Sequence, residues 1–267
     1  ALKNVFSQLE KSNAKIKGTF IGVVGNLKSL QKNERFIDED LNRTWTKENL
    51  EKEQASSSEQ MEMKEIISIL ENYSNQDFPD KYFIDCHSTS SDSLPFISVQ
   101  VVGKNDEFAQ RFPTYIVRGF SDIVNGSIDK YFSLQGLTGF TFEAGQHTAT
   151  TTQTNHEAII WLALKNVCGL NLNSLDTFPV SVAHLTGEKS IEQQTFQIIY
   201  RHGLEASDTF EMKSGFKNFQ EIKVGDLLAV QNGKEIRSEW NANIFMPLYQ
   251  KQGNDGFFII EKVTCFF

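Results

Sequence analysis

The chain has 267 residues, of which 39% are hydrophobic and 22% are charged, and its formal net charge is -8. These values fit a globular protein with a sizeable core, built as one large domain or as a large and a small one. The acidic balance disfavours a nucleic-acid partner, because phosphate binding requires a basic face. The longest apolar run, Ile159 to Leu164, is too short to span a bilayer, so no membrane association is expected.

The elements predicted in the first part of the chain alternate between helix and strand. Apolar side chains at helical spacing predict a helix at the start, and the β-branched run Thr19 to Val24 predicts a buried strand. Residues 27–57 are polar and irregular. The later patterns predict helices over 59–73, 106–111 and 154–168 and strands over 82–86, 96–102, 115–117 and 138–143. We therefore expect an α/β fold: a mixed, mostly parallel sheet flanked by helices.

The sequence pattern changes after about residue 171. Residues 178–267 carry short β-branched and aromatic runs broken by glycines, which is typical of a small all-β domain. The predicted domains are residues 1–172, an α/β domain, and residues 173–267, a β-rich domain that shapes the substrate entrance. The three cysteines, Cys86, Cys168 and Cys265, show no paired spacing, which disfavours disulfides and fits a cytoplasmic location.

Two arginines and an asparagine stand in a loop after the first predicted strand. Arg35 and Arg43 are suited to clamping a carboxylate or polarising a carbonyl, and Asn42 both donates and accepts hydrogen bonds. The alternative is a solvated charged loop in which Asp40 caps a turn.

Two further candidates follow predicted strands. His87 comes just after a buried strand, where open α/β sheets place their ligand sites, and a neutral imidazole there is a good zinc ligand. Asp85, two residues earlier, is placed to hydrogen-bond that histidine or to serve a structural role. Glu143 ends another apolar strand, where burial would raise its pKa and favour a general base. The alternatives are a histidine that only holds a loop and a carboxylate paired to an arginine.

Together these segments resemble the succinylglutamate desuccinylase/aspartoacylase group of the zinc carboxypeptidase-like superfamily. The matching segments, in chain order, are Arg35, the "DLNR" motif Asp40-Leu41-Asn42-Arg43, the "D-x-H-x-T" segment Asp85-Cys86-His87-Ser88-Thr89 and Phe142-Glu143-Ala144-Gly145. The resemblance implies a zinc-dependent amidohydrolase that cleaves a small N-acyl amino acid into an amino acid and a carboxylate. It is compatible with a homo-oligomer, since the family often associates.

The resemblance also implies a role for each matching residue. His87 is the zinc ligand, Glu143 activates water, Arg35 stabilises the oxyanion, and Asn42 and Arg43 hold the α-carboxylate of the substrate. In the β-rich end, residues 246–251 resemble the segment that returns a tyrosine to the site. That segment makes Tyr249 and Lys251 further substrate-binding candidates, against the alternative of an ordinary edge strand.

One departure from the family pattern affects the metal site. The family begins with a segment like "H-G-N-E" that supplies two zinc ligands, and no H-x-x-E precedes Arg35 in this chain. We expect both ligands upstream of Ala1, because a parallel sheet without an inner strand would expose unpaired backbone. The alternative is a truncation that cannot hold zinc properly. Two rival functions stay open: a metallocarboxypeptidase acting on peptides and a non-catalytic binding protein with the same fold.

Overall fold

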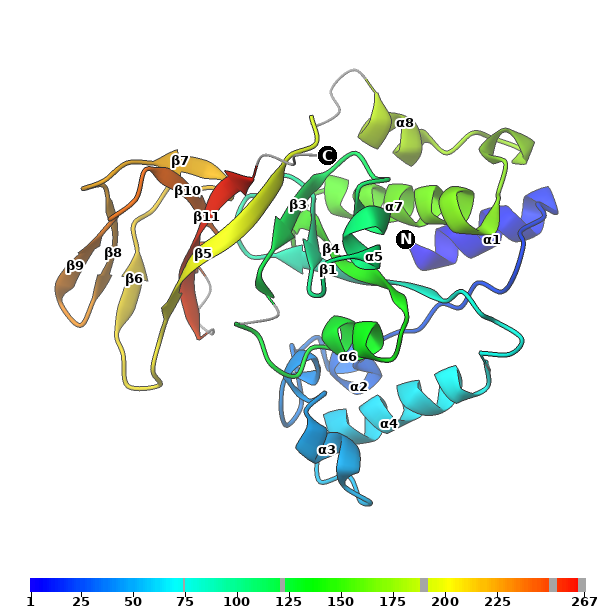
Figure 1. Cartoon of the computed structure of the whole chain (residues 1–267), viewed down its shortest axis with the longest axis horizontal. Helices are drawn as coiled ribbons and strands as arrows, with labels where there is room; N and C mark the ends of the chain where they lie inside the picture. Colours follow the sequence, from blue (N-terminus) through cyan, green and yellow to red (C-terminus); the bar gives the residue numbers. More distant parts are fainter. Residues whose placement is uncertain (74, 121–122, 188–191, 250–253, 264–267) are drawn as a thin grey trace.

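A single eight-stranded sheet runs through the computed structural model, which describes residues 1–73, 75–120, 123–187, 192–249 and 254–263 (Figure 1). In order across the sheet, the strands are β1 (Tyr82–Thr89), β4 (Thr138–Gln146), β2 (Phe96–Val99), β3 (Tyr115–Arg118), β5 (Thr195–Gly203), β11 (Asp255–Val263), β10 (Ala242–Phe245) and β7 (Gln220–Ile222). The pairs β1–β4, β2–β3 and β3–β5 are parallel, and β2–β4 is antiparallel. The predicted fold class, a mixed sheet flanked by helices, is confirmed.

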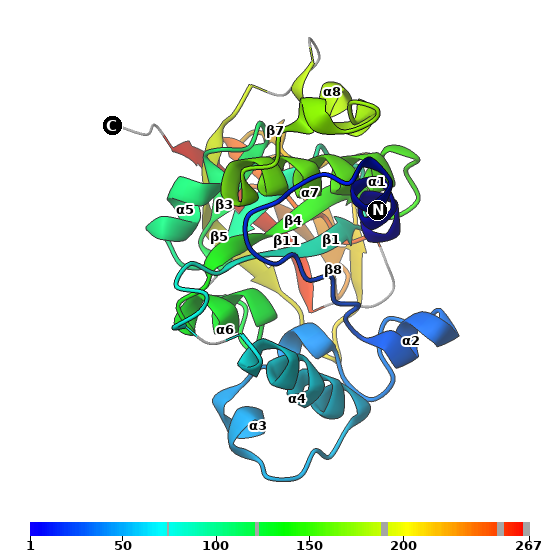
Figure 2. The ribbon, with the colours of Figure 1, turned by 90° about the vertical axis from the view of Figure 1, so that its right-hand side faces the viewer.

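Helices cover both faces of the sheet (Figures 1 and 2). One face carries α1 (Leu2–Ser12), α5 (Lys104–Ala109), α7 (Thr151–Cys168) and α8 (Val180–Thr186). The other carries α2 (Leu27–Lys32), α3 (Lys47–Glu51), α4 (Ser58–Glu71) and α6 (Ile128–Leu134). In the described part of the chain, none of these helices combines the length and the apolar character that crossing a bilayer requires.

The strands β1 and β4 approach each other so closely that one position in β4 has to be glycine. A Cβ atom on Gly139 would lie 2.1 Å from the carbonyl oxygen of Phe83. Phe140 packs against Phe108 of α5, Phe142 lies edge-on to His156 of α7, and both phenylalanines share the main core with Trp161. Fully burying a large side chain of this kind stabilises a fold by about 1.5–3 kcal/mol. The apolar alternation of β4 therefore fixes which face of the strand turns to α7.

The C-terminal region both extends the main sheet and adds a second one. Its strands β5, β11, β10 and β7 continue the main sheet, all with antiparallel pairing among themselves. The strands β6 (Phe210–Met212), β8 (Leu227–Gln231) and β9 (Lys234–Arg237) form a separate antiparallel sheet. This antiparallel β region was predicted, although α8 also lies after residue 172. The domain boundary at residue 172 stays a prediction.

The prediction of a buried strand over Thr19 to Val24 is wrong. These residues belong to no helix or strand, and Val24 is 50% exposed. A β-branched run becomes a strand only where a neighbouring strand takes its hydrogen bonds. β1 ends the order of strands in the main sheet and pairs with β4, not with residues 19–24. The irregular stretch expected over residues 27–57 also contains the short helices α2 and α3 and a 3-10 turn, Leu41–Arg43.

Candidate active site

The sheet face that turns away from α7 carries a row of polar side chains at the carboxyl ends of β1 and β4. The parallel register pairs Asp85 with Thr141 and His87 with Glu143. Alternate residues of a strand share a face, so these four side chains lie on one side of the sheet. The structure thus brings His87 and Glu143 together as direct neighbours on adjacent strands.

The imidazole of His87 is held by the carboxylate of Asp85, at 2.9 Å between Nε2 and Oδ2. Its Nδ1 atom makes no hydrogen bond within the described residues. Burial alone would lower the pKa of His87, but the charge and hydrogen bond of Asp85, together with the charge of Glu143, raise that pKa to about 10. A carboxylate that fixes one ring nitrogen and leaves the other open is the usual support of a metal-binding histidine.

The carboxylate of Glu143 is buried with unused hydrogen-bonding capacity. Its side chain is 8% exposed, and its Oε2 atom has no hydrogen-bond partner within the described residues. Burial raises the pKa of Glu143 to about 7, with the charge of Asp85 adding to the rise and His87 and Arg35 opposing it. A carboxyl group with such a pKa exchanges protons readily near neutrality, as a general base must.

The loop that carries Arg35 is arranged around Asp40. One carboxylate oxygen of Asp40 accepts from Arg35 at 2.8 Å, and the other accepts from the backbone N–H of Asn42 at 2.9 Å. The guanidinium of Arg35 is 54% exposed, and its charge reaches Glu143, whose pKa it lowers. Arg35 is therefore near enough to Glu143 to act on it electrostatically.

Asn42 and Arg43 pack against the start of α6. The side-chain oxygen of Asn42 accepts from the backbone N–H of Ile128 at 3.0 Å. The guanidinium of Arg43 donates to the carbonyl of Asn42 at 2.7 Å. Gly126 makes this approach possible, because its φ is +74° and a Cβ there would lie 2.3 Å from the carbonyl oxygen of Arg43. Among the described residues, neither Asn42 nor Arg43 contacts His87 or Glu143 through a hydrogen bond.

A buried glutamate that the sequence did not point out holds this loop in place. Glu59, in the first turn of α4, is 0% exposed and accepts from the backbone N–H groups of Ile37 at 2.7 Å and Asp38 at 3.2 Å. It also accepts from the side chain of Asn26 at 3.2 Å. Ser57 before it has the pattern of a helix cap, but nothing local indicates where the Glu59 carboxylate points.

A second buried carboxylate contacts the polar row through Thr141. Asp129 of α6 is 1% exposed, and its carboxylate accepts from the hydroxyl of Thr141 at 2.7 Å. Burial raises the pKa of Asp129, and its charge contributes to the raised pKa of His87. Asp129 sits in a stretch without a motif, so its role follows only from the packing of α6 against β4.

Of the two C-terminal candidates, the structure describes Tyr249 but not Lys251. Tyr249 accepts a hydrogen bond from the N–H of Phe216 and donates one to the carbonyl of Lys213, each at 2.9 Å. Its hydroxyl therefore bonds within the C-terminal region. Lys251 lies outside the described residues. The same region is tied to the loop after β1, where Lys217 pairs with Asp92 at 2.7 Å.

The residues that the structure describes supply a candidate zinc ligand but do not complete a zinc site. Zinc takes three or four protein ligands, and His87 is one good candidate with its Nδ1 open. In the part of the chain that the structure describes, no group of three or more His, Cys, Asp or Glu side chains could hold a metal ion. Among these residues, the donor set therefore fits one ligand position and not a whole site.

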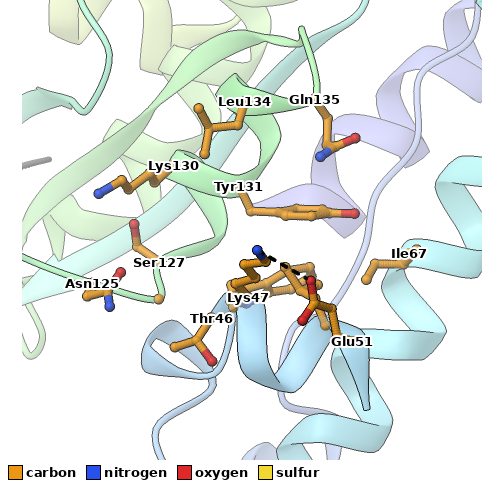
Figure 3. Close-up of a pocket in the computed structure, with 13 residues that line it drawn as sticks. Thr46, Lys47, Glu51, Ile67, Asn125, Ser127, Lys130, Tyr131, Leu134 and Gln135 are labelled. Carbon is orange, nitrogen blue, oxygen red and sulfur yellow. Dashed lines mark ion pairs between the residues drawn. The ribbon is translucent and has the colours of Figure 1, made fainter. Parts of the chain in front are cut away.

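A cavity of about 570 Å³ lies apart from the polar row, between α3, α4 and α6 (Figure 3). Its wall combines Trp45, Tyr131 and Leu134 with Lys47, whose ammonium lies 3.7 Å from the carboxylate of Glu51. Neither His87 nor Glu143 lines it. The polar row is thus separate from this cavity.

Comparison with known families settles the relationship of this chain. The model of the succinylglutamate desuccinylase/aspartoacylase catalytic domain matches residues 1–160. The chain belongs to this family. Members of the family are deacylases that hydrolyse amides of N-acyl amino acids, and the family is generally zinc-dependent. No curated protein matches the sequence.

Solved structures of the family share the fold at low sequence identity. A succinylglutamate desuccinylase from Vibrio parahaemolyticus is 14% identical, with a TM-score of 0.67 over 98% of this chain and 76% of its own. Murine aminoacylase 3 is 13% identical, with a TM-score of 0.64 over 98% and 90%. The product-bound ectoine utilization protein EutE from Ruegeria pomeroyi is 15% identical, with a TM-score of 0.63 over 90% and 73%.

Proposed function

We propose that this protein hydrolyses the amide bond of a small N-acyl amino acid and releases the free amino acid and a carboxylate. The observation that supports this reaction most is the buried carboxylate of Glu143, with Oε2 unpartnered among the described residues, beside the His87–Asp85 pair. A buried carboxylate without a partner costs stability, so such a group is expected where a reaction uses it.

The proposed catalytic steps use groups at the ends of β1 and β4. Glu143 takes a proton from a water molecule, and the hydroxide attacks the amide carbonyl. Glu143 then passes the proton to the departing amine, so that the proton balance of the hydrolysis closes. Arg35, exposed and already within electrostatic reach of Glu143, stabilises the oxyanion of the tetrahedral intermediate.

The proposed substrate contacts lie in two regions of the chain. Asn42 and Arg43 bind the α-carboxylate, since a guanidinium offers a bidentate match to that group. Tyr249 and Lys251 are proposed as further contacts from the C-terminal region. For Tyr249, this requires that its hydroxyl give up one of its bonds to the segment from Lys213 to Phe216.

We also propose zinc as the cofactor, with His87 as the ligand that the described residues supply. The family's general zinc dependence and the open Nδ1 of His87 support this assignment. The ligand set is incomplete within the described residues, which instead favours a second candidate, a non-catalytic binding protein that retains the fold.

One experiment separates the two candidates. The protein, extended upstream of Ala1 to include the expected H-G-N-E segment, is purified, analysed for zinc by elemental mass spectrometry, and assayed with N-acetylaspartate and N-succinylglutamate before and after chelation. We expect bound zinc, release of free amine, and a loss of roughly a hundredfold or more in kcat for Glu143→Gln. The control is Glu48→Gln, which changes an exposed carboxylate on α3. Zinc-free protein that binds these compounds without cleaving them would establish the binding protein.

A further inference from the structure

An exposed histidine stands beside the polar row in a fixed orientation. The Nδ1 atom of His147 lies 2.8 Å from the hydroxyl oxygen of Ser88, the residue after His87. The backbone N–H of His147 donates to the carbonyl of Thr89 at 2.9 Å. Both contacts join the residue after β4 to the end of β1, so the imidazole is held through its backbone and through its ring.

The other ring nitrogen is available to a ligand. Nε2 of His147 makes no hydrogen bond within the described residues, and the side chain is exposed. An exposed imidazole is normally free to rotate, whereas this one is held by a neighbouring hydroxyl. A polar group held in one orientation loses little conformational entropy when it binds a partner. Such a group is well suited to recognise a ligand.

The charges nearby indicate the kind of partner. Burial lowers the pKa of His147, and the positive charge of Arg35 lowers it further. An anion that enters this neighbourhood is attracted by the guanidinium of Arg35. When Ser88 donates to Nδ1, the proton of His147 resides on Nε2, which then acts as a hydrogen-bond donor.

We infer that His147, held by Ser88, donates a hydrogen bond from Nε2 to a carboxylate oxygen of the substrate and thereby contributes to substrate selection. This inference rests on the proposed function, since it presumes that an N-acyl amino acid binds at the polar row. Ser88 is a positioning residue in this arrangement, because it acts only through the ring of His147.

The test compares acids with their amides in a set of variants. Kinetics are measured for N-acetylaspartate and for its two monoamides, one at each carboxyl group, with the wild type, His147→Ala, His147→Gln, Ser88→Ala and Ser88→Thr. His184→Ala is the matched control, because His184 is another exposed histidine but belongs to α8 and, among the described residues, makes no hydrogen bond with Ser88. Circular dichroism verifies that every variant is folded.

His147→Ala is expected to raise KM for N-acetylaspartate roughly 10- to 100-fold, the range for losing one hydrogen bond to a charged group, with kcat within about twofold. The increase should disappear for one monoamide, the one that lacks the contacted carboxylate. His147→Gln should keep part of the affinity, because its amide N–H₂ can donate from a similar position. Ser88→Ala should have a smaller effect than His147→Ala, and Ser88→Thr should restore the wild-type KM.

An unchanged KM for His147→Ala, or an equal increase for all three compounds, would overturn the inference while leaving the proposed hydrolysis intact. If the wild type cleaves none of the compounds, the proposed function fails, and the inference is judged by calorimetric binding. A dissociation constant for N-acetylaspartate that is at least about tenfold larger in His147→Ala than in the wild type would then support it. Equal constants, or no binding, would overturn it.

Discussion

The two faces of the β1–β4 pair use the same strands for opposite purposes. On the face toward α7, Phe140 and Phe142 are almost completely buried in the main core. On the opposite face, His87 and Glu143 stand side by side, and Glu143 leaves Oε2 without a partner in the described part of the chain. Packing on one face supplies stability, so that the other face can hold groups that cost stability.

The largest expected effect tests the apolar face. Phe142→Ala should lower the free energy of unfolding by about 3–5 kcal/mol, because it removes a fully buried ring and leaves a cavity beside α7. Urea denaturation measures this loss. Leu134→Ala, at a side chain that is 70% exposed, should change stability by less than about 0.5 kcal/mol. A loss for Phe142→Ala no larger than that of the control would contradict the stabilising role of this face.

The next effect tests how the polar face is held together. Glu59→Gln should cost about 1.5–3 kcal/mol, because a neutral amide replaces a buried carboxylate that accepts backbone N–H groups of the Arg35 loop. Thermal unfolding measures the loss, and faster proteolysis within residues 33–43 should accompany it. Glu71→Gln, an exposed change at the other end of α4, is the control. Equal stabilities for the two variants would show that Glu59 does not organise the loop.

A smaller effect concerns how the free energy of unfolding depends on pH through the carboxylate of Glu59. Burial would raise the pKa of Glu59, but the N–H groups of Ile37, Asp38 and Glu39 outweigh it and hold the pKa below its usual value of 4.5. The stabilisation from this carboxylate is therefore complete above pH 4.5 and is lost as the pH falls below it.

Unfolding measured from pH 6 downward should show this loss in the wild type and a shallower dependence in Glu59→Gln. Phe142→Ala should keep the wild-type slope, because it changes no titrating group. Parallel curves for the wild type and Glu59→Gln would mean that other carboxylates dominate acid unfolding.

The smallest expected effect is on stability at the centre of the polar face. Glu143→Gln should change the free energy of unfolding by less than about 1 kcal/mol, although it should abolish most of the activity. The physical reason is that Glu143 has a carboxylate oxygen without a hydrogen bond to lose. A destabilisation as large as that of Phe142→Ala would show that Glu143 serves the fold.

The fold was predictable wherever a local pattern coincides with a packed element. The amphipathic pattern of α7 and the apolar alternation of β4 both indicate their elements, and the DLNR and D-x-H-x-T segments indicate the family. The strand expected over Thr19 to Val24 failed because strand formation depends on a pairing partner, which no local pattern contains. The candidate site was predictable for His87 and Glu143, whose strands end side by side.

The chemical groups of this protein can be identified from the sequence: an imidazole and carboxylates at the ends of apolar strands, and arginines in a loop that precedes these strands. Tertiary structure alone decided which of these groups meet. The register of β1 against β4 sets His87 beside Glu143, the burial of Glu59 orders the arginine loop, and the end of β1 brings Ser88 to His147. The physical reason is that these contacts join residues far apart in the chain, where neither spacing nor propensity specifies a distance.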